Sequence, residues 1–97
     1  MRAARVDANQ RDIDDAARAV GAVIVRASMA PDLGFDRIYG YKGQPHICEI
    51  KDPAKPPSAR KLTENEQKVK AALEAVGVAY HVIETDDDLY RVFGLKG

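Results

Sequence analysis

Residues 35–51 read FDRIYGYKGQPHICEIK, and this stretch decides the fold. The four residues YKGQ (41–44) divide it into two runs, 35–41 and 44–51, that are rich in aromatic and β-branched residues. Such runs are typical of β-strands, and a glycine at the second central position between them is typical of a two-residue hairpin turn. We therefore predict an antiparallel hairpin in which the first and last residues of YKGQ lie opposite each other.

The register of this hairpin brings two acidic side chains together. Asp36 lies directly opposite Glu49, where Cβ atoms on one face of the sheet are about 4.5–5.5 Å apart. Lys51, two residues beyond Glu49, projects from the same face. Two opposed carboxylates destabilise a hairpin unless a cation neutralises them. We therefore expect Asp36, Glu49 and Lys51 to converge at one end of the hairpin.

These three residue types suit metal-assisted phosphodiester hydrolysis. Mg²⁺ is bound by one or two carboxylates and retains waters or substrate phosphate oxygens. A lysine beside the metal can orient or deprotonate the attacking water, or stabilise the charge that develops on the phosphoryl group. The residues alone leave an alternative open, in which Asp36 lies at a loop edge and Glu49 and Lys51 form a surface ion pair of little energetic value.

The rest of the chain predicts helices and strands around the hairpin. The predicted elements are a helix from a cap at Asp7 to a stop at Gly21, a buried strand over 22–25, a helix from a cap at Thr63 to about Val76, a strand over 78–83 and a last helix capped by Asp86. Glu66, three residues after Thr63, completes a capping box, and prolines exclude regular structure over 52–57. The order α-β-β-β-α-β-α predicts an α/β (α+β) fold, with a mixed sheet flanked by helices.

Composition predicts one globular domain over residues 1–97. The chain has 97 residues, 45% of them apolar, and 15 basic and 15 acidic residues give a net charge of zero. A disordered chain, a protein that coats nucleic acid by bulk charge and a membrane-spanning protein are therefore not expected. The single cysteine, Cys48, excludes an internal disulfide, predicts a buried thiol and indicates the reducing cytoplasm.

A local excess of basic residues follows the hairpin. Residues 51–70 contain six basic and three acidic side chains. Lys55, Arg60 and Lys61 lie in this segment, close to the expected carboxylate pair and before the start of a helix, so they are candidates for contact with DNA phosphates. A solvated linker and helix face is the alternative explanation of the same charges.

Several motifs resemble a known family. Phe35-Asp36 and Glu49-Ile50-Lys51, separated by the gap 37–48, resemble the signature of the PD-(D/E)XK nuclease superfamily. The wider runs GFDRI, CEIKD and PSARKLT are similar to small standalone VRR-Nuc-like nucleases of phages and bacteria. The resemblance covers most of the chain and implies a restriction-endonuclease-like αβββαβ core. It also implies a Mg²⁺- or Mn²⁺-dependent endonuclease that cleaves DNA in the cytoplasm of a bacterium or phage-infected cell, in some members at branched or junction structures as a homodimer.

The same resemblance implies roles for individual residues. Asp36 and Glu49 correspond to the metal ligands, and the main-chain carbonyl of Ile50 corresponds to a further ligand of the metal. Lys51 matches the catalytic lysine. Gln67 lies near the start of the second predicted helix, where the wider fold often has a polar active-site residue.

This chain departs from the family pattern at three places. Phe35 replaces the usual proline, and the literal Pro31-Asp32 falls in a loop outside the hairpin register, so we prefer Asp36 as the metal ligand. Gln10 stands where many relatives have a glutamate on the first helix, and an amide binds a hard cation less well than a carboxylate does. Two alternatives to the endonuclease therefore stay open: a catalytically weak or inactive DNA-binding or interaction module, and a metal-dependent hydrolase of free nucleotides.

Overall fold

The computed structural model describes residues 8–27, 30 and 32–95. Its elements are α1 (Ala8–Ala19), β1 (Val23–Arg26), β2 (Arg37–Tyr41), β3 (Gln44–Ile50), the 3₁₀ helix η2 (Pro57–Arg60), α2 (Glu64–Ala75), β4 (Tyr80–Ile83) and α3 (Asp86–Val92). The strands form one sheet in the order β1-β2-β3-β4, in which only the β3–β4 pair is parallel. The predicted α+β class, with a mixed sheet and helices, is confirmed.

The hairpin of β2 and β3 has the predicted register. Tyr41 pairs with Gln44 across a turn in which Lys42 and Gly43 both have positive φ angles, of 50° and 79°. Two consecutive left-handed residues are the mark of a type I′ turn, whose twist matches that of the strands it joins. The pairing continues along the hairpin to Arg37 opposite Cys48.

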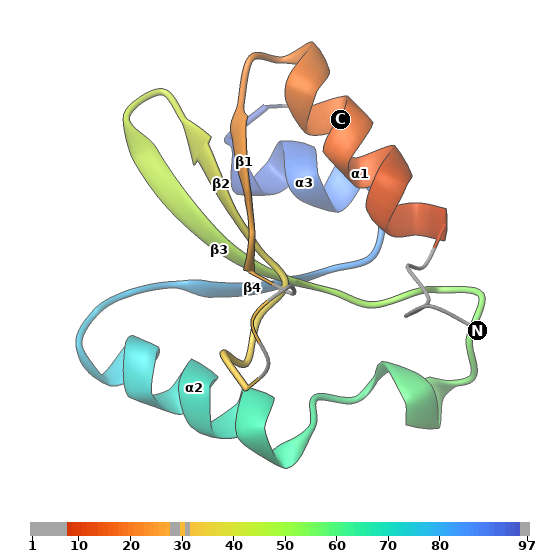
Figure 1. Cartoon of the computed structure of the whole chain (residues 1–97), viewed down its shortest axis with the longest axis vertical. Helices are drawn as coiled ribbons and strands as arrows, with labels where there is room; N and C mark the ends of the chain where they lie inside the picture. The colour runs from red at the N-terminus through yellow and green to blue at the C-terminus, as the bar shows by residue number, and fades with distance from the viewer. Residues whose placement is uncertain (1–7, 28–29, 31, 96–97) are drawn as a thin grey trace.

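Helices cover the two faces of the sheet unequally. In Figure 1, α1 and α3 lie together on one side of the sheet and α2 lies alone on the other. The face toward α1 and α3 carries the core, whose largest fully buried side chains are Ile13, Tyr39, Cys48, Ile83 and Leu89. Cys48 is thus the predicted core thiol, and its burial raises the pKa of the thiol to about 12. No helix in the described part of the chain is both long enough and apolar enough to cross a membrane.

The first strand is an edge strand, not the buried strand that we predicted. Ala22 is buried under α1, but Val23 and Val25 are 67% and 51% exposed. Both valines project from the face that carries α2, and α2 does not extend over β1. A β-branched run indicates a strand, but it does not show where in the sheet that strand lies.

The ends of the helices agree only in part with the prediction. Thr63 caps α2 through the predicted capping box with Glu66. The cap of α3 is Thr85, one residue before the predicted Asp86, because its hydroxyl accepts the N–H of Asp88. Pro57, expected to be irregular, opens η2, since proline fits the first position of a helix. The predicted cap of the first helix, Asp7, lies outside the described residues.

Candidate active site

Asp36 is held next to Glu49 by two main-chain hydrogen bonds. The N–H of Asp36 donates to the carbonyl of Cys48 at 3.1 Å, and the Asp36 Oδ2 accepts the N–H of Ile50 at 2.8 Å. The second bond takes the place of a regular sheet bond, so β2 begins at Arg37, two residues after the predicted start at Phe35, and Asp36 and Glu49 are not a pair of the ladder as predicted. The Asp36 and Glu49 side chains line the same pocket, and each affects the pKa of the other.

Lys51 completes the expected group of three. Its Nζ lies 3.3 Å from Glu49 Oε2 and 2.9 Å from Glu66 Oε1. The Lys51 and Glu49 side chains are only 11% and 5% exposed, so the ion pair is shielded from water. The structure therefore brings Asp36, Glu49 and Lys51 together as the sequence predicted, although Asp36 lies just before the first paired residue of β2.

Glu66 is the member of this cluster that sequence reasoning missed. The sequence identified it only as the second half of the α2 capping box. That box brings its carboxylate back over the start of the helix, where Oε1 accepts the N–H of Thr63 at 2.9 Å. Because the start of α2 faces the end of β3, the same oxygen also reaches Lys51.

A close approach at Gly34 positions α2 against the hairpin. Gly34 has a φ of +83°, and a Cβ built on it would lie 2.6 Å from Val69 Cγ2 on α2. The Gly34 carbonyl also accepts a hydrogen bond of 2.6 Å from the hydroxyl of buried Tyr80 on β4. A larger residue at position 34 would therefore push α2, and Glu66 with it, away from Lys51.

The cluster opens onto a small polar pocket. This pocket has a volume of about 270 Å³ and lies between the loop before β2 and the start of α2. Asp36, Glu49 and Glu66 line it, together with Phe35 and Asn65. The carboxylates are thus accessible to a small ligand while their ion pairs stay largely buried.

Burial and mutual repulsion shift the acidity of the cluster. Burial, reinforced by the negative charge of Asp36, raises the pKa of Glu49 to about 9. Burial also raises the pKa of Asp36, although the N–H of Ile50 opposes the shift. For Lys51, burial alone would favour the neutral amine, but the ion pairs with Glu66 and Glu49 raise its pKa. The pocket thus contains more carboxyl groups than one ammonium can neutralise.

The donor atoms fit a hard divalent cation. Glu49 Oε1 is buried and has no hydrogen-bond partner in the structure. Such an atom costs free energy unless a ligand satisfies it, and carboxylate oxygen is what Mg²⁺ and Mn²⁺ prefer. Within the described residues, no three His, Cys, Asp or Glu side chains could together hold a metal. A cation here would therefore take Asp36, Glu49 and water, whereas Ile50, whose main-chain carbonyl was the third predicted ligand, is not among the residues that line the pocket.

Two polar residues predicted as accessory lie outside the cluster. The side-chain amide of Gln67 donates to the carbonyl of Leu62 at 3.1 Å. The Gln10 Oε1 accepts a hydrogen bond of 3.3 Å from Arg37, which also forms a buried ion pair with Asp14. Gln10 thus supports the buried arginine, and α1 contributes no carboxylate from this position.

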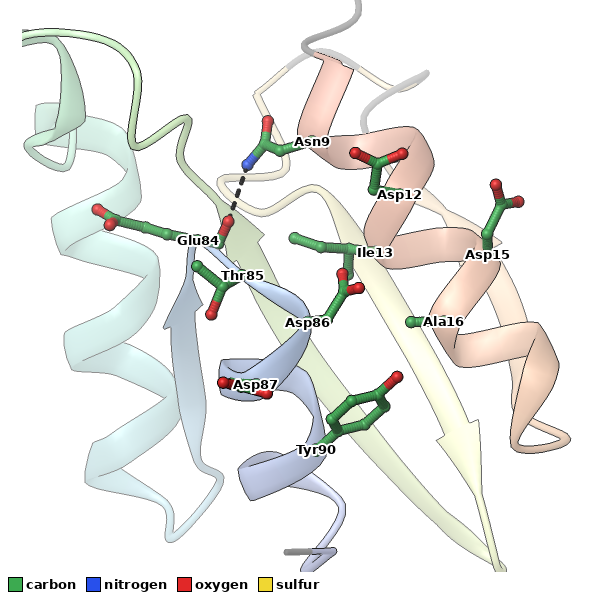
Figure 2. Close-up of a pocket in the computed structure, with 10 residues that line it drawn as sticks. All are labelled: Asn9, Asp12, Ile13, Asp15, Ala16, Glu84, Thr85, Asp86, Asp87 and Tyr90. Carbon is green, nitrogen blue, oxygen red and sulfur yellow. Dashed lines mark hydrogen bonds between the residues drawn. The ribbon is translucent and has the colours of Figure 1, made fainter. Parts of the chain in front are cut away.

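The residue beside Gln10 ties α1 to the active-site end of the sheet. The side-chain amide of Asn9 donates to the carbonyl of Lys51 at 2.8 Å. It also donates to the carbonyl of Glu84 at 3.2 Å, as Figure 2 shows. These residues directly follow β3 and β4. Asn9 therefore fixes the main chain that carries Lys51, a role the sequence did not indicate.

A larger pocket lies between α1 and α3, on the other side of the sheet from the cluster. Its volume is about 700 Å³, and Figure 2 shows acidic side chains from both helices around it. Among them are Asp12, Asp15, Asp86 and Asp87, and none of the ten described lining residues is basic. Among the described residues, this pocket is therefore lined by acidic side chains with no basic one, as is the smaller pocket of the cluster.

The basic residues predicted to contact DNA follow Lys51 along the chain. Lys55 and Lys61 are exposed on either side of η2. Arg60 is less accessible, because its side chain is 30% exposed and lies 3.5 Å from Glu84. Lys55 and Lys61 are therefore more exposed than Arg60.

No family model, curated protein or solved structure matches this chain. The nuclease resemblance therefore stays a prediction from the motifs. The geometry of the cluster is the remaining basis for assigning a function.

The raised pKa of Glu49 predicts a pH-dependent stability. A glutamate in the unfolded chain titrates near pH 4.3, whereas burial and Asp36 raise the pKa of Glu49 in the folded state to about 9. Protonated Glu49 therefore stabilises the folded state. This stabilisation is complete below the pKa of the unfolded chain and is lost as the pH rises through the folded pKa. Between pH 7 and 8.5, above the range in which histidines titrate, we expect the free energy of unfolding in EDTA to fall by about 1–2 kcal/mol. Urea unfolding at several pH values measures this.

The matched control for this experiment is Glu49→Gln. The amide has nearly the same shape but does not ionise, so its stability should be almost constant over the same pH range. The prediction is wrong if wild type and Glu49→Gln show the same slope. Adding Mg²⁺ should reverse the wild-type trend, because a bound cation stabilises the ionised carboxylates.

Proposed function

We propose that this protein is a Mg²⁺- or Mn²⁺-dependent endodeoxyribonuclease that hydrolyses phosphodiester bonds. The observation that carries the proposal is the partnerless, buried Glu49 Oε1, which lies in one pocket with Asp36 while the Lys51 ammonium pairs with the other Glu49 oxygen. Metal-dependent phosphodiester hydrolysis needs carboxylates that bind the divalent cation and a positive charge that stabilises the phosphate, and this cluster contains both.

Each residue of the cluster has a distinct role in this proposal. Asp36 and Glu49 would hold the cation, which supplies Lewis-acid activation of a phosphate oxygen and of water. Lys51 holds its ammonium next to the cation site, where it stabilises the charge that develops on the phosphoryl group. Because its ion pairs keep Lys51 protonated, this role fits better than that of a general base.

The substrate and partners are part of the same proposal. A chain of this size has little surface for reading bases, so we propose selection by DNA structure, such as a branch or junction. A homodimer would present one cluster to each strand of a duplex. A cytoplasmic location is consistent with the single buried thiol.

A panel of DNA substrates tests the proposal. The protein is incubated with single-stranded, duplex, flap and four-way DNA in Mg²⁺, in Mn²⁺ and in EDTA. We expect cleavage in either metal, faster on a branched substrate than on duplex, and none in EDTA. Free nucleotides serve as the comparison: hydrolysis of nucleotides without cleavage of any DNA would reassign the site to a nucleotide hydrolase.

One observation favours a second function, that of a catalytically weak DNA-binding module. Gln10 is bound to Arg37 and offers the metal no carboxylate. A site with two acids binds a cation less tightly than one with three. Metal binding in calorimetry without cleavage of any substrate in the panel would support this module over the enzyme.

A further inference from the structure

We propose that Glu66 is a positioning residue for catalysis, which holds the Lys51 ammonium and thereby leaves Glu49 Oε1 free for the cation. This inference rests on the proposed function and adds a residue that its motifs do not contain. Glu66 Oε1 accepts two hydrogen bonds of 2.9 Å, one from Lys51 Nζ and one from the N–H of Thr63. One oxygen thus joins the start of α2 to the lysine of the cluster.

Helix capping alone does not explain the contact with Lys51. The capping box of α3 has the same design, in which Asp88 accepts the N–H of Thr85. There the second carboxylate oxygen pairs with Arg91, whose side chain is 70% exposed. Glu66 is instead only 15% exposed, and its partner Lys51 is 11% exposed. The acidic residue of a capping box can therefore pair with an exposed residue, as in α3. In α2 it pairs instead with the largely buried ammonium of Lys51.

The distances show what Glu66 does for the site. Lys51 Nζ is nearer to Glu66 Oε1, at 2.9 Å, than to Glu49 Oε2, at 3.3 Å. Without the Glu66 charge, Glu49 would be the carboxylate left to Lys51, and the ammonium would compete with a cation for it. Glu66 thus forms the shorter ion pair with Lys51, and one oxygen of Glu49 stays available to the metal.

The test substitution is Glu66→Gln. Glutamine serves at this position of a capping box, so α2 keeps its cap while the charge on Lys51 is lost. Glu64→Gln is the control for charge, because Glu64 is in the same helical turn with a side chain that is 87% exposed. Thr85→Ala is the control for general destabilisation, because it removes the cap of α3.

Three measurements separate positioning from structure. We expect Glu66→Gln to lower kcat on the preferred DNA substrate 10–100-fold and to weaken Mn²⁺ binding in calorimetry about tenfold. In the metal-free protein, we expect the slowly exchanging NMR signal of the Lys51 ammonium to disappear. Glu64→Gln and Thr85→Ala should keep kcat and Mn²⁺ affinity within about twofold of wild type. Both variants should also retain the NMR signal of the Lys51 ammonium.

The outcomes also separate this inference from the proposed function. If wild type cleaves no substrate, the nuclease proposal fails, and the Lys51 NMR signal still decides the role of Glu66. If Glu66→Gln keeps that signal, or if its losses equal those of Thr85→Ala, Glu66 is a helix cap only and the inference is overturned.

Discussion

Substitution of Lys51 by alanine is expected to lower the rate of DNA cleavage about 10³-fold. The Lys51 ammonium lies 3.3 Å from Glu49 Oε2, and Glu49 lines the pocket in which we propose that the phosphate binds. Removing one preorganised charge from an active site typically costs 10²–10³-fold in kcat, because no solvent rearrangement replaces it. Single-turnover cleavage of the preferred substrate, at saturating Mg²⁺, measures the chemical step directly.

Controls for this experiment address stability and charge. Lys51→Ala leaves Glu49 and Glu66 without their shared cation, so we expect a lower melting temperature in EDTA that is largely restored by Mg²⁺. Lys68→Ala, in a residue whose side chain is 74% exposed and pairs with Glu64, should cleave at the wild-type rate. Cleavage by a folded Lys51→Ala protein within tenfold of wild type would contradict the proposed role of the lysine.

The part of the site that the sequence predicted is the part set by local rules. A two-residue turn fixes the register, and the alternation of side chains then puts Asp36, Glu49 and Lys51 on one face. Each step needs only residues 36–51, all in one hairpin. The order of elements followed from similar local signals, such as the capping box at Thr63.

The contributions of the two helices were not predictable in the same way. Whether Glu66 or Gln67 faces Lys51 depends on the rotation of α2 against the sheet, which the close contact of Gly34 with Val69 sets. Likewise, a helix rotates by about 100° per residue, so Asn9 reaches Lys51 while the neighbouring Gln10 reaches Arg37. The capping box was the signal that could have pointed to Glu66, because it directs this carboxylate toward the start of α2.

The exposure of Val23 and Val25 has the same kind of cause. Their β-branched side chains predict a strand, but only the spatial order of the strands makes β1 an edge. Burial in a sheet is a property of neighbours that are distant in sequence.

Asp36→Asn is expected to weaken Mn²⁺ binding more than about 100-fold while the fold stays intact. The carbonyl oxygen of the introduced amide can still accept the N–H of Ile50, which preserves the end of the hairpin. What is lost is one of two carboxylates available to the cation. Removing this charge also lowers the pKa of Glu49, so the metal-free variant should be as stable as wild type or more stable by up to ~1 kcal/mol.

Asp32→Asn is the matched control, because Asp32 lines the same pocket and follows the literal Pro31 of the motif. Asp32 is exposed and lies outside the hairpin register, so its variant should bind Mn²⁺ within about threefold of wild type. Calorimetry of both variants, with urea unfolding in EDTA, gives affinity and stability separately. If Asp32→Asn loses the metal and Asp36→Asn keeps it, the ligand is the aspartate after the proline. If Asp36→Asn instead weakens Mn²⁺ binding and raises stability in EDTA, the Asp36 carboxylate increases metal affinity and lowers the stability of the metal-free protein. This combination is expected of a residue whose role is to bind a ligand.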